Sequence, residues 1–147
     1  FKFAEPSIIF CFIFIFLIEK ISLYFGSKKV SVSVIMASKD TPDEYLNASI
    51  KSILNQSHKN FEFIIVADGG NDGKLIRQNF NDQRIKILEN KTSKGLPYSL
   101  NKALKLVKGK YVYRMDSDDI AAKRRIENLY GNTSKCGCLW NVCKNIR

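Results

Sequence analysis

Four short runs of β-favouring, largely apolar residues alternate with helical patterns along the middle of the chain. This alternation limits the possible folds more than any other feature of the sequence. The runs cover residues 30–36, 61–67, 84–88 and 111–115. Strands that alternate with helices of this length form βαβ units, in which the strands are parallel and the connections right-handed. The sequence therefore predicts an α/β domain over residues 30–130, with a mostly parallel sheet and flanking helices.

The helix after the first strand has a start signal and one apolar face. Residues 41–44 read Thr-Pro-Asp-Glu, which predicts Thr41 as the N-cap, Pro42 in the first helical position and Glu44 as the partner in a capping box. Apolar residues then recur at helical spacing and form the predicted buried stripe: Leu46, Ile50, Ile53 and Leu54.

Three further helices are expected. One lies near residues 74–80, and another covers residues 120–130. Between them, a helix is predicted to start near Gly95 and to end at Gly109. This helix is expected to bury one stripe of apolar residues: Leu96, Leu100, Ala103, Leu104 and Val107. Together with the four strands, these helices complete the alternating pattern.

The fourth run ends in three carboxylates within four positions, Asp116-Ser117-Asp118-Asp119. Carboxylates this close repel one another unless a cation neutralises them. Mg²⁺ and Mn²⁺ prefer such oxygen ligands together with substrate phosphates. In open α/β sheets, ligands bind outside the carboxyl ends of the strands. The cluster therefore predicts a metal and phosphate site, and a solvated acidic turn is the alternative.

A second acidic loop follows the second run and reads Asp-Gly-Gly-Asn-Asp-Gly at residues 68–73. Its glycines let the backbone take positive φ and let a ligand approach closely. Asp68 stands at the end of the strand, where its carboxylate can accept an N–H of a base. The alternative is that Asp68 or Asp72 caps the next helix. Because parallel strands place both acidic loops at one edge of the sheet, a binding site there is favoured.

Composition restricts the partners. The formal charge of +10 suits an anionic partner: nucleic acid, an acidic membrane surface or a diphosphate-bearing substrate. The basic residues form no stripe interleaved with aromatics, so nucleic acid is the weakest of these, and a merely solubilising excess of lysine stays open. The cysteines form no convincing disulfide framework, and Cys136, Cys138 and Cys143 lack a fourth zinc ligand. A reducing, cytoplasmic setting fits.

The two ends of the chain differ from the central domain. Residues 1–29 contain an apolar stretch whose uncharged part, residues 8–18, is shorter than the ~20 residues of a transmembrane helix. Three interpretations stay open: the end of a transmembrane helix, a membrane-surface anchor, or sequence at the edge of a fragment. A spanning segment followed by Lys28-Lys29 would hold the domain on the cytoplasmic side. Residues 131–147 form an irregular, cysteine-rich tail with no pattern of a further strand.

The series of motifs from about residue 30 to residue 130 resembles the N-terminal half of a family 2 glycosyltransferase with the GT-A fold. The matching stretches are residues 32–36, 61–69, 94–96, 100–103 and 109–119. The resemblance implies a Rossmann-like sheet that binds a nucleotide-sugar donor, commonly a UDP-sugar, with Mg²⁺ or Mn²⁺. The acceptor that it implies is a saccharide or a lipid-linked saccharide, as in the biosynthesis of cell-envelope polysaccharides.

The resemblance also implies roles for particular residues. Asp68 matches the carboxylate that reads the uracil ring, and Lys94 is a candidate diphosphate contact, with an ordinary surface lysine as the alternative. Asp116 and Asp118 match the DXD motif, in which Asp116 touches the ribose side and Asp118 holds the metal and the diphosphate. Asp119 is the alternative metal ligand. The metal acts as a Lewis acid on the leaving diphosphate.

The sequence departs from the family pattern in two stretches. Residues 37–40 read Ala-Ser-Lys-Asp where the family usually has Pro-Val/Thr-Tyr-Asn, so an aromatic stacking contact to the base is lost or moved. Residues 67–70 read Ala-Asp-Gly-Gly in place of Asp-Asp-Gly-Ser. The residues after 130 do not resemble the half of the family that carries the catalytic base, which inverting transfer requires. We therefore expect a donor-binding half: a fragment, or a truncated or frameshifted product.

The motifs and the family resemblance are compatible with three functions. Glycosyl transfer by an inverting family 2 enzyme is the leading hypothesis. The second is a non-catalytic, membrane-associated module that binds a nucleotide or a metal, or an inactive gene fragment. The third is another α/β nucleotide enzyme, such as a nucleotidyltransferase, but residues 68–73 lack the Gly-Lys-Ser/Thr ending of a phosphate-binding P-loop. The donor sugar, the acceptor, the linkage and the oligomeric state are not readable from the sequence.

Overall fold

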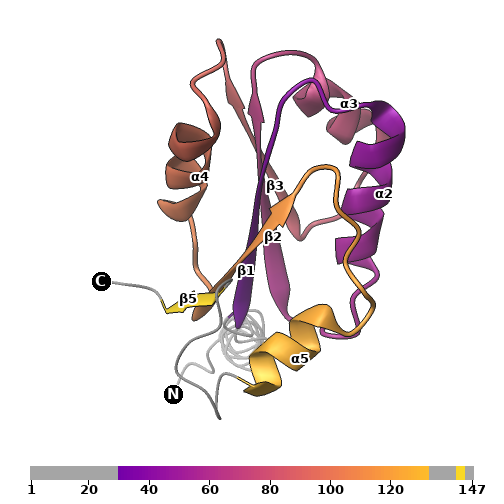
Figure 1. Ribbon diagram of the computed structural model, residues 1–147, viewed down its shortest axis with the longest axis vertical. Helices are drawn as coiled ribbons and strands as arrows, with labels where there is room; N and C mark the ends of the chain where they lie inside the picture. The colour runs from indigo at the N-terminus through magenta and orange to yellow at the C-terminus, as the bar shows by residue number, and fades with distance from the viewer. Residues whose placement is uncertain (1–29, 133–141, 145–147) are drawn as a thin grey trace, which may run out of the picture.

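A computed structural model describes residues 30–132 and 142–144 of the chain. The apolar N-terminal segment and the cysteines at 136 and 138 lie outside the described residues. Strands and helices alternate as predicted (Figure 1), in the order β1 (Val32–Ser38), α2 (Asp43–Leu54), β2 (Phe61–Asp68), α3 (Asp72–Asn79), β3 (Ile85–Asn90), α4 (Leu96–Leu104), β4 (Tyr111–Asp116), α5 (Arg125–Asn132) and β5 (Val142–Lys144).

The described strands form one sheet in the order β3-β2-β1-β4-β5. The first four are parallel to one another, which confirms the predicted α/β fold with a mostly parallel sheet. β5 pairs with β4 in the antiparallel direction. The prediction that no further strand follows residue 130 is therefore wrong at residues 142–144, because three residues are too few to show a strand periodicity.

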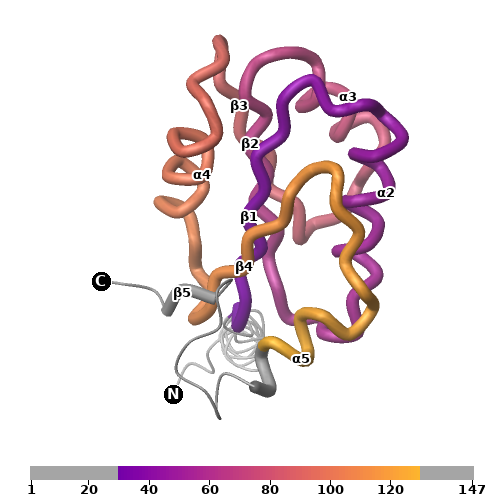
Figure 2. Tube along the Cα trace, viewed as in Figure 1, coloured from indigo at the N-terminus to yellow at the C-terminus, as the bar shows by residue number. Residues whose placement is uncertain are grey.

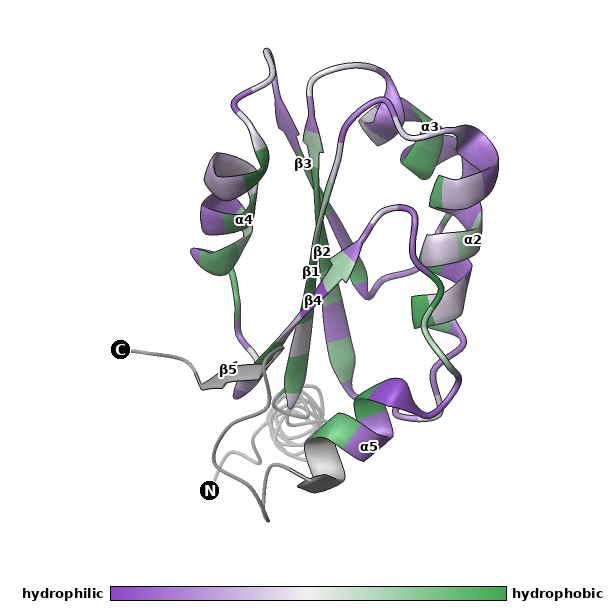
Figure 3. Cartoon of the chain, in the orientation of Figure 1, coloured by the Kyte–Doolittle hydropathy of each residue, from purple (hydrophilic) through white to green (hydrophobic). Residues whose placement is uncertain are grey.

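Helices cover both faces of the sheet. α4 lies on one face, and α2 and α3 lie on the other (Figure 1). Strand alternation divides the core accordingly: Val34, Met36 and Phe63 pack with the apolar face of α2, whereas Ile35, Ile64 and Val66 pack with Ala103 of α4. The hydropathy colouring shows apolar residues concentrated along the central strands (Figure 3). Leu46, Ile50 and Ile53 are buried and Leu54 packs against them, which confirms the predicted stripe of α2.

The stripe predicted for α4 is only partly buried. Ala103 is buried and Leu100 and Val107 pack beside it, but Leu96 is 45% exposed and Leu104 is 44% exposed. α4 has nine residues, and Leu96 and Leu104 are its first and last residues. Gly109 does not end this helix. A Cβ at Gly109 would lie 2.6 Å from the backbone nitrogen of Ser33, so glycine is needed where the turn before β4 crosses β1.

The predicted capping box at the start of α2 is wrong. The helix begins at Asp43, after Pro42, and no side chain caps it. The hydroxyl of Thr41 instead forms a hydrogen bond with the hydroxyl of Ser117 (2.9 Å), in the loop that follows β4. α5 likewise starts later than predicted, at Arg125, because Ser52 Oγ accepts a hydrogen bond from the backbone N–H of Ala121 (2.9 Å) and holds this stretch against α2.

Among the described residues, none of the helices is both long and apolar enough to span a bilayer. The segment at residues 1–29, for which a membrane role was left open, lies outside that range.

Candidate functional site

The carboxyl ends of β1, β2 and β4 meet at one edge of the sheet. The register pairs Ala37 of β1 with Asp116 of β4, and Ser38 of β1 with Ala67 of β2. This arrangement confirms that the two acidic loops share an edge. The strand order reverses between β1 and β4, since β2 and β3 lie on the other side of β1. Such a switch point is where open α/β sheets bind their ligands.

The chain after β4 runs beside α2 before it descends to α5 (Figure 2). Two serines of α2 hold it there: Ser49 Oγ donates to the carbonyl of Asp116 (3.1 Å), and Ser52 Oγ accepts from the N–H of Ala121 (2.9 Å). The loop after β4 therefore faces the loop between β1 and α2. The bond between Thr41 and Ser117 joins these two loops directly.

A pocket of about 550 Å³ lies between the two loops. It is lined by Lys39, Asp40, Thr41, Pro42, Tyr45, Ser117 and Asp118. Its wall thus offers an ammonium group, two carboxylates and one aromatic ring. Tyr45 as a residue is 56% exposed. Asp40 takes a φ of 48°, a left-handed conformation that non-glycine residues rarely adopt and that is often found at functional sites.

Of the predicted site residues, the structure places Asp118 in this pocket. Asp119 is also exposed, but it is not part of the lining. Within the described part of the chain, no hydrogen bond or ion pair engages either carboxylate. Asp118, and not Asp119, is therefore a residue of the pocket wall.

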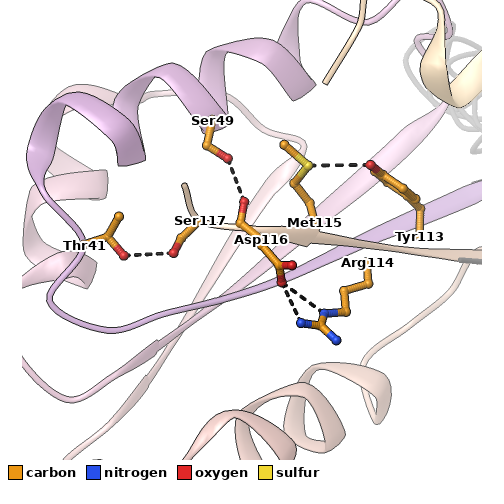
Figure 4. A network of polar contacts seen from close by, with 7 residues as sticks. All are labelled: Thr41, Ser49, Tyr113, Arg114, Met115, Asp116 and Ser117. Atoms are coloured by element: carbon orange, nitrogen blue, oxygen red, sulfur yellow. Dashed lines mark hydrogen bonds and ion pairs between the residues drawn. The ribbon is translucent and has the colours of Figure 1, made fainter. Parts of the chain in front are cut away.

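Asp116 points away from the pocket. Its carboxylate accepts hydrogen bonds from Nε (3.1 Å) and Nη2 (2.8 Å) of Arg114, two residues earlier on the same strand. Figure 4 shows this pair on the side of the strand away from Ser49, whereas Ser117 turns toward Thr41. Both side chains of the pair are about half exposed. Asp116 is thus already neutralised by a neighbouring guanidinium group.

Asp68 is buried at the end of β2 and is only 3% exposed. Its Oδ1 accepts from Asn90 Nδ2 (2.7 Å) and the N–H of Lys94 (2.8 Å), and its Oδ2 accepts from Ser93 Oγ (2.9 Å) and the N–H of Gly95 (2.8 Å). Burial would raise the pKa of Asp68, but these four donors outweigh it and hold the pKa well below its usual range. The carboxylate is ionised and fully bonded within the chain.

Neither acidic residue caps α3, which was the alternative considered for Asp68 and Asp72. The N-cap of α3 is Asn71, and no side chain forms a cap hydrogen bond there. Asp72 is buried, and its Oδ2 accepts a long hydrogen bond from the N–H of Thr41 (3.4 Å). The side chain of Lys94 is exposed beside the Asp68 cluster. Neither Asp68 nor Lys94 lines the pocket at Asp118.

The side chains that could bind a metal can be compared with the needs of a divalent cation. Among the described residues, no three His, Cys, Asp or Glu side chains come together as a ready-made metal centre. The pocket has two carboxylates, Asp40 and Asp118, and neither forms a hydrogen bond or ion pair within the described residues. Such carboxylates fit a hard divalent cation that takes its other ligands from water and from a bound diphosphate, which is the usual binding mode of Mg²⁺.

Most residues of the pocket wall were not predicted as site residues from the sequence. Lys39 and Asp40 directly follow β1, so the rule that ligands bind at the carboxyl ends of strands could have identified them. Ser117 directly follows β4 inside the predicted acidic cluster, whereas Tyr45 carried no such signal. Tyr45 reaches the pocket from the first turn of α2, and Ser117 reaches it through a bond to a residue 76 positions away.

The parallel sheet and its switch-point pocket define the class of this domain, which is a Rossmann-like α/β domain. The sequence matches the model of glycosyl transferase family 2 over residues 33–138. This match covers most of the chain, and the chain therefore belongs to glycosyl transferase family 2.

Proteins of similar sequence are also named as glycosyltransferases. An uncharacterized glycosyltransferase of Methanocaldococcus jannaschii is 42% identical over 106 residues, which make up 69% of this chain and 37% of that protein. The UDP-Glc:α-D-GlcNAc-diphosphoundecaprenol β-1,3-glucosyltransferase WfgD of Escherichia coli is 36% identical over 97 residues, or 65% of this chain and 38% of that protein. The chain thus spans somewhat more than a third of the length of these relatives.

Solved structures show the same fold. The crystal structure of S. aureus TarS 1–349 in complex with UDP-GlcNAc matches with a TM-score of 0.64 and 24% sequence identity, over 71% of this chain and 31% of that chain. At this identity the likeness concerns the fold alone. It confirms the expected GT-A arrangement of the sheet and its helices.

Proposed function

We propose that the chain binds a nucleotide sugar, most favourably a UDP-sugar, for glycosyl transfer to a saccharide or lipid-linked acceptor. Membership of glycosyl transferase family 2 supplies the reaction class. The observation that carries the proposal for this chain is the pocket at the switch point between β1 and β4. It combines the unpaired carboxylate of Asp118, the ammonium group of Lys39 and the exposed ring of Tyr45.

The names of similar proteins support the choice of donor and acceptor. TarS has been solved with UDP and with UDP-GlcNAc. Two relatives from Escherichia coli are named as glucosyltransferases with UDP-Glc and a GlcNAc-diphosphoundecaprenol, which is a lipid-linked saccharide. Others are named for O-antigen and teichuronic acid biosynthesis. By analogy, we place this chain in the biosynthesis of a cell-envelope polysaccharide, at the cytoplasmic face of a membrane.

Asp118 is the residue best placed to hold Mg²⁺ or Mn²⁺ in this proposal, and Asp119 becomes the weaker candidate. When bound, the ion supplies Lewis-acid stabilisation of the charge on the leaving diphosphate. Lys39, on the opposite loop of the same pocket, can place its ammonium group on a diphosphate oxygen. Lys94 is exposed at the neighbouring loop and is a second candidate for that contact.

Tyr45 offers the face on which a base can stack. Tyr45 lines the pocket together with Pro42, and more than half of the surface of this residue is exposed. Stacking of a base on an aromatic side chain contributes about 1–3 kcal/mol per base. The family's usual aromatic position after β1 is Lys39 in this chain, so we propose that Tyr45 provides the stacking contact from α2. The base then lies against α2, and the diphosphate lies between Lys39 and Asp118.

Isothermal titration of UDP into the full chain, with and without Mn²⁺, tests the proposal. Asp118→Asn is the test variant, and Asp119→Asn is its matched control. We expect Mn²⁺-dependent binding that Asp118→Asn weakens by about tenfold or more, since a charge-assisted contact is lost. Asp119→Asn should bind as the wild type does. No binding to a chain that circular dichroism shows to be folded contradicts the proposal.

Transfer is measured separately in the same samples, with UDP-sugars and a lipid-linked saccharide acceptor. Release of UDP that depends on the acceptor supports the full reaction. Binding of UDP without any transfer supports the alternative of a non-catalytic binding module.

A further inference from the structure

We infer that the outward side of α4 and of the turn after it is a docking surface for an anionic lipid bilayer. This lysine–leucine face is defined by its exposed residues, which are Tyr98, Leu104, Lys105, Leu106 and Lys108. The inference rests on the proposed function in one respect, since a lipid-linked acceptor lies in a membrane. The observations that carry it involve no nucleotide.

One side of α4 packs on the sheet, and the other side faces away from it. Ser99 and Ala103 are fully buried. With ~3.6 residues per turn, Tyr98 and Lys105 lie about two turns apart on the opposite side of the helix. Tyr98 is 53% exposed, and Leu104 and Leu106, at the carboxyl end, are each 44% exposed. In the described part of the chain, no second helix lies beside α4 on this face of the sheet (Figure 1).

The charges along α4 and the segments that flank it have a single sign. Every charged residue between positions 91 and 115 is basic, namely Lys91, Lys94, Lys102, Lys105, Lys108, Lys110 and Arg114. By contrast, the first turn of α2 on the other face contains Asp43 and Glu44. Within the described residues, Lys105 and Lys108 form no ion pair. A positive surface of this kind attracts a negatively charged partner.

The apolar residues of the lysine–leucine face favour a bilayer over nucleic acid. Leu104 and Leu106 directly flank Lys105 in the sequence. A lysine can hold its ammonium group at the level of the lipid phosphates while its alkyl stem and the neighbouring leucines lie at the boundary of the acyl chains. Surfaces that bind single-stranded nucleic acid instead combine basic residues with aromatic rings on which successive bases stack. On this face Tyr98 is the one exposed aromatic residue.

Docking through α4 leaves the nucleotide pocket open to water. α2 contributes Tyr45 to the pocket and lies on the opposite face of the sheet from α4 (Figure 1). A bilayer that lies along α4 therefore does not cover the α2 side of the pocket. A soluble nucleotide sugar and a membrane-bound acceptor can thus approach the domain from different sides.

The first experiment measures co-sedimentation of the full chain with vesicles made of equal parts of phosphatidylglycerol and phosphatidylcholine. The double variant Lys105→Gln, Lys108→Gln should bind about 25-fold more weakly than the wild type, since each lysine at an anionic surface contributes about a fivefold factor. The matched control, Lys51→Gln with Lys74→Gln, removes the same charge from exposed positions on α2 and α3. It should stay within about threefold of the wild type, because charges far from the surface are screened. An equal loss in both double variants overturns the inference.

The second experiment tests the contact of the leucines with the acyl chains. Leu104→Gln with Leu106→Gln should weaken binding to the same vesicles by about tenfold, because two apolar side chains no longer leave water. Ile120→Gln is the control, since Ile120 is exposed in the loop after β4 and lies outside the lysine–leucine face. Unchanged binding of the leucine variant overturns the inference.

Other occupants of the face give different results. Binding of double-stranded DNA that the lysine variant loses, without any binding to vesicles, would assign the face to nucleic acid. A dimer in analytical ultracentrifugation without lipid, which the leucine variant dissociates, would assign it to a second copy of the chain. Either result contradicts docking to a bilayer.

A measurement on the wild type keeps the test independent of the folding of the variants. In NMR with bicelles of the same lipids that contain a paramagnetic lipid, the amides of Leu104, Lys105 and Leu106 should broaden most. The amide of Lys51 in α2 should broaden least, and broadening centred on α2 overturns the inference. If the bicelles bind but UDP does not, the proposed function fails and the docking surface stands. If UDP binds but the bicelles do not, the docking surface alone fails.

Discussion

Replacement of Glu62 by glutamine tests the physical account of this domain away from its binding site. Glu62 is buried near the amino end of the sheet. Its Oε1 accepts hydrogen bonds from Ser33 Oγ (2.6 Å) and the N–H of Lys108 (2.6 Å), and its Oε2 pairs with Lys86 Nζ (2.5 Å). Glutamine keeps an oxygen for Ser33 and Lys108, but it turns an amide NH₂ toward the Lys86 ammonium group. The ion pair is the interaction that is lost.

The expected loss of stability in Glu62→Gln depends on how exposed Lys86, the partner of Glu62, is. Breaking a fully buried ion pair costs about 3–5 kcal/mol, because a charge is left without a partner or water. The side chain of Lys86 is 38% exposed, so its ammonium group can turn to the solvent. A hydrogen bond to a charged group contributes about 1.5–3 kcal/mol. We therefore expect Glu62→Gln to lower the free energy of unfolding by about 2 kcal/mol at neutral pH.

Urea unfolding followed by circular dichroism measures this change as a lower midpoint with an unchanged slope. Glu44→Gln, which removes an exposed carboxylate at the start of α2, is the matched control and should change stability by less than about 0.5 kcal/mol. If Glu62→Gln is no more destabilising than Glu44→Gln, the reasoning about the buried pair is wrong.

The same variant has a defined pH dependence. Burial would raise the pKa of Glu62, but Lys86, Ser33 and Lys108 outweigh it and hold the pKa below its ordinary value. As the pH falls, the unfolded chain takes up the proton first. The stabilisation is therefore complete above about pH 4.3, the ordinary pKa, and is lost as the pH falls through the lower pKa of the folded state. The stability difference between wild type and Glu62→Gln should shrink over this window, whereas a constant difference contradicts the account.

Two further predictions concern close packing and the pocket. Gly109→Ala should destabilise the fold by about 1–3 kcal/mol in urea unfolding, since its Cβ would strike the backbone of Ser33. Gly73→Ala is the control and should cost less, because its Cβ meets the exposed, flexible end of Glu89; equal costs contradict the packing argument. Tyr45→Ala should weaken UDP binding by about tenfold, the lower end of a stacking contribution, whereas Tyr45→Phe retains the ring and should bind as wild type. An unchanged affinity in Tyr45→Ala refutes the stacking contact.

The architecture was predictable because its signals are local and periodic. The uninterrupted apolar run at residues 63–67 of β2 and the spacing of Leu46, Ile50 and Ile53 in α2 each depend on neighbouring residues, and the structure confirms both. The shared edge of the two acidic loops followed from parallel pairing alone. Once the sheet was predicted to be parallel, the position of both acidic loops at one edge followed.

The side-chain chemistry was less predictable because its partners are distant in sequence. The donors of Asp68 lie 22 to 27 residues further along the chain, so its full set of hydrogen bonds could not be read from the acidic loop. Thr41 showed a local capping signal, yet its hydroxyl is taken by Ser117, 76 residues away. A tertiary contact thus replaced the local one.

The choice between Asp118 and Asp119 shows the same limit. The two residues are adjacent and chemically identical, so composition and spacing cannot rank them. They differ in the structure, since the turn after β4 places Asp118 and not Asp119 in the pocket wall. The Arg114–Asp116 pair was also missed, although side chains two residues apart lie on the same face of a strand.

The most direct test of the central claim is to locate the bound metal and nucleotide by NMR, with UDP and a small amount of paramagnetic Mn²⁺ added to the full chain. We expect selective broadening of the amides of Thr41, Ser117 and Asp118, which line the pocket. The amide of Val32, the first residue of β1, should stay the sharpest of this strand, because it lies farthest from the pocket at about 3.3 Å per residue. Broadening centred away from Asp118, or none when UDP is present, would contradict the assignment of this pocket as the nucleotide site.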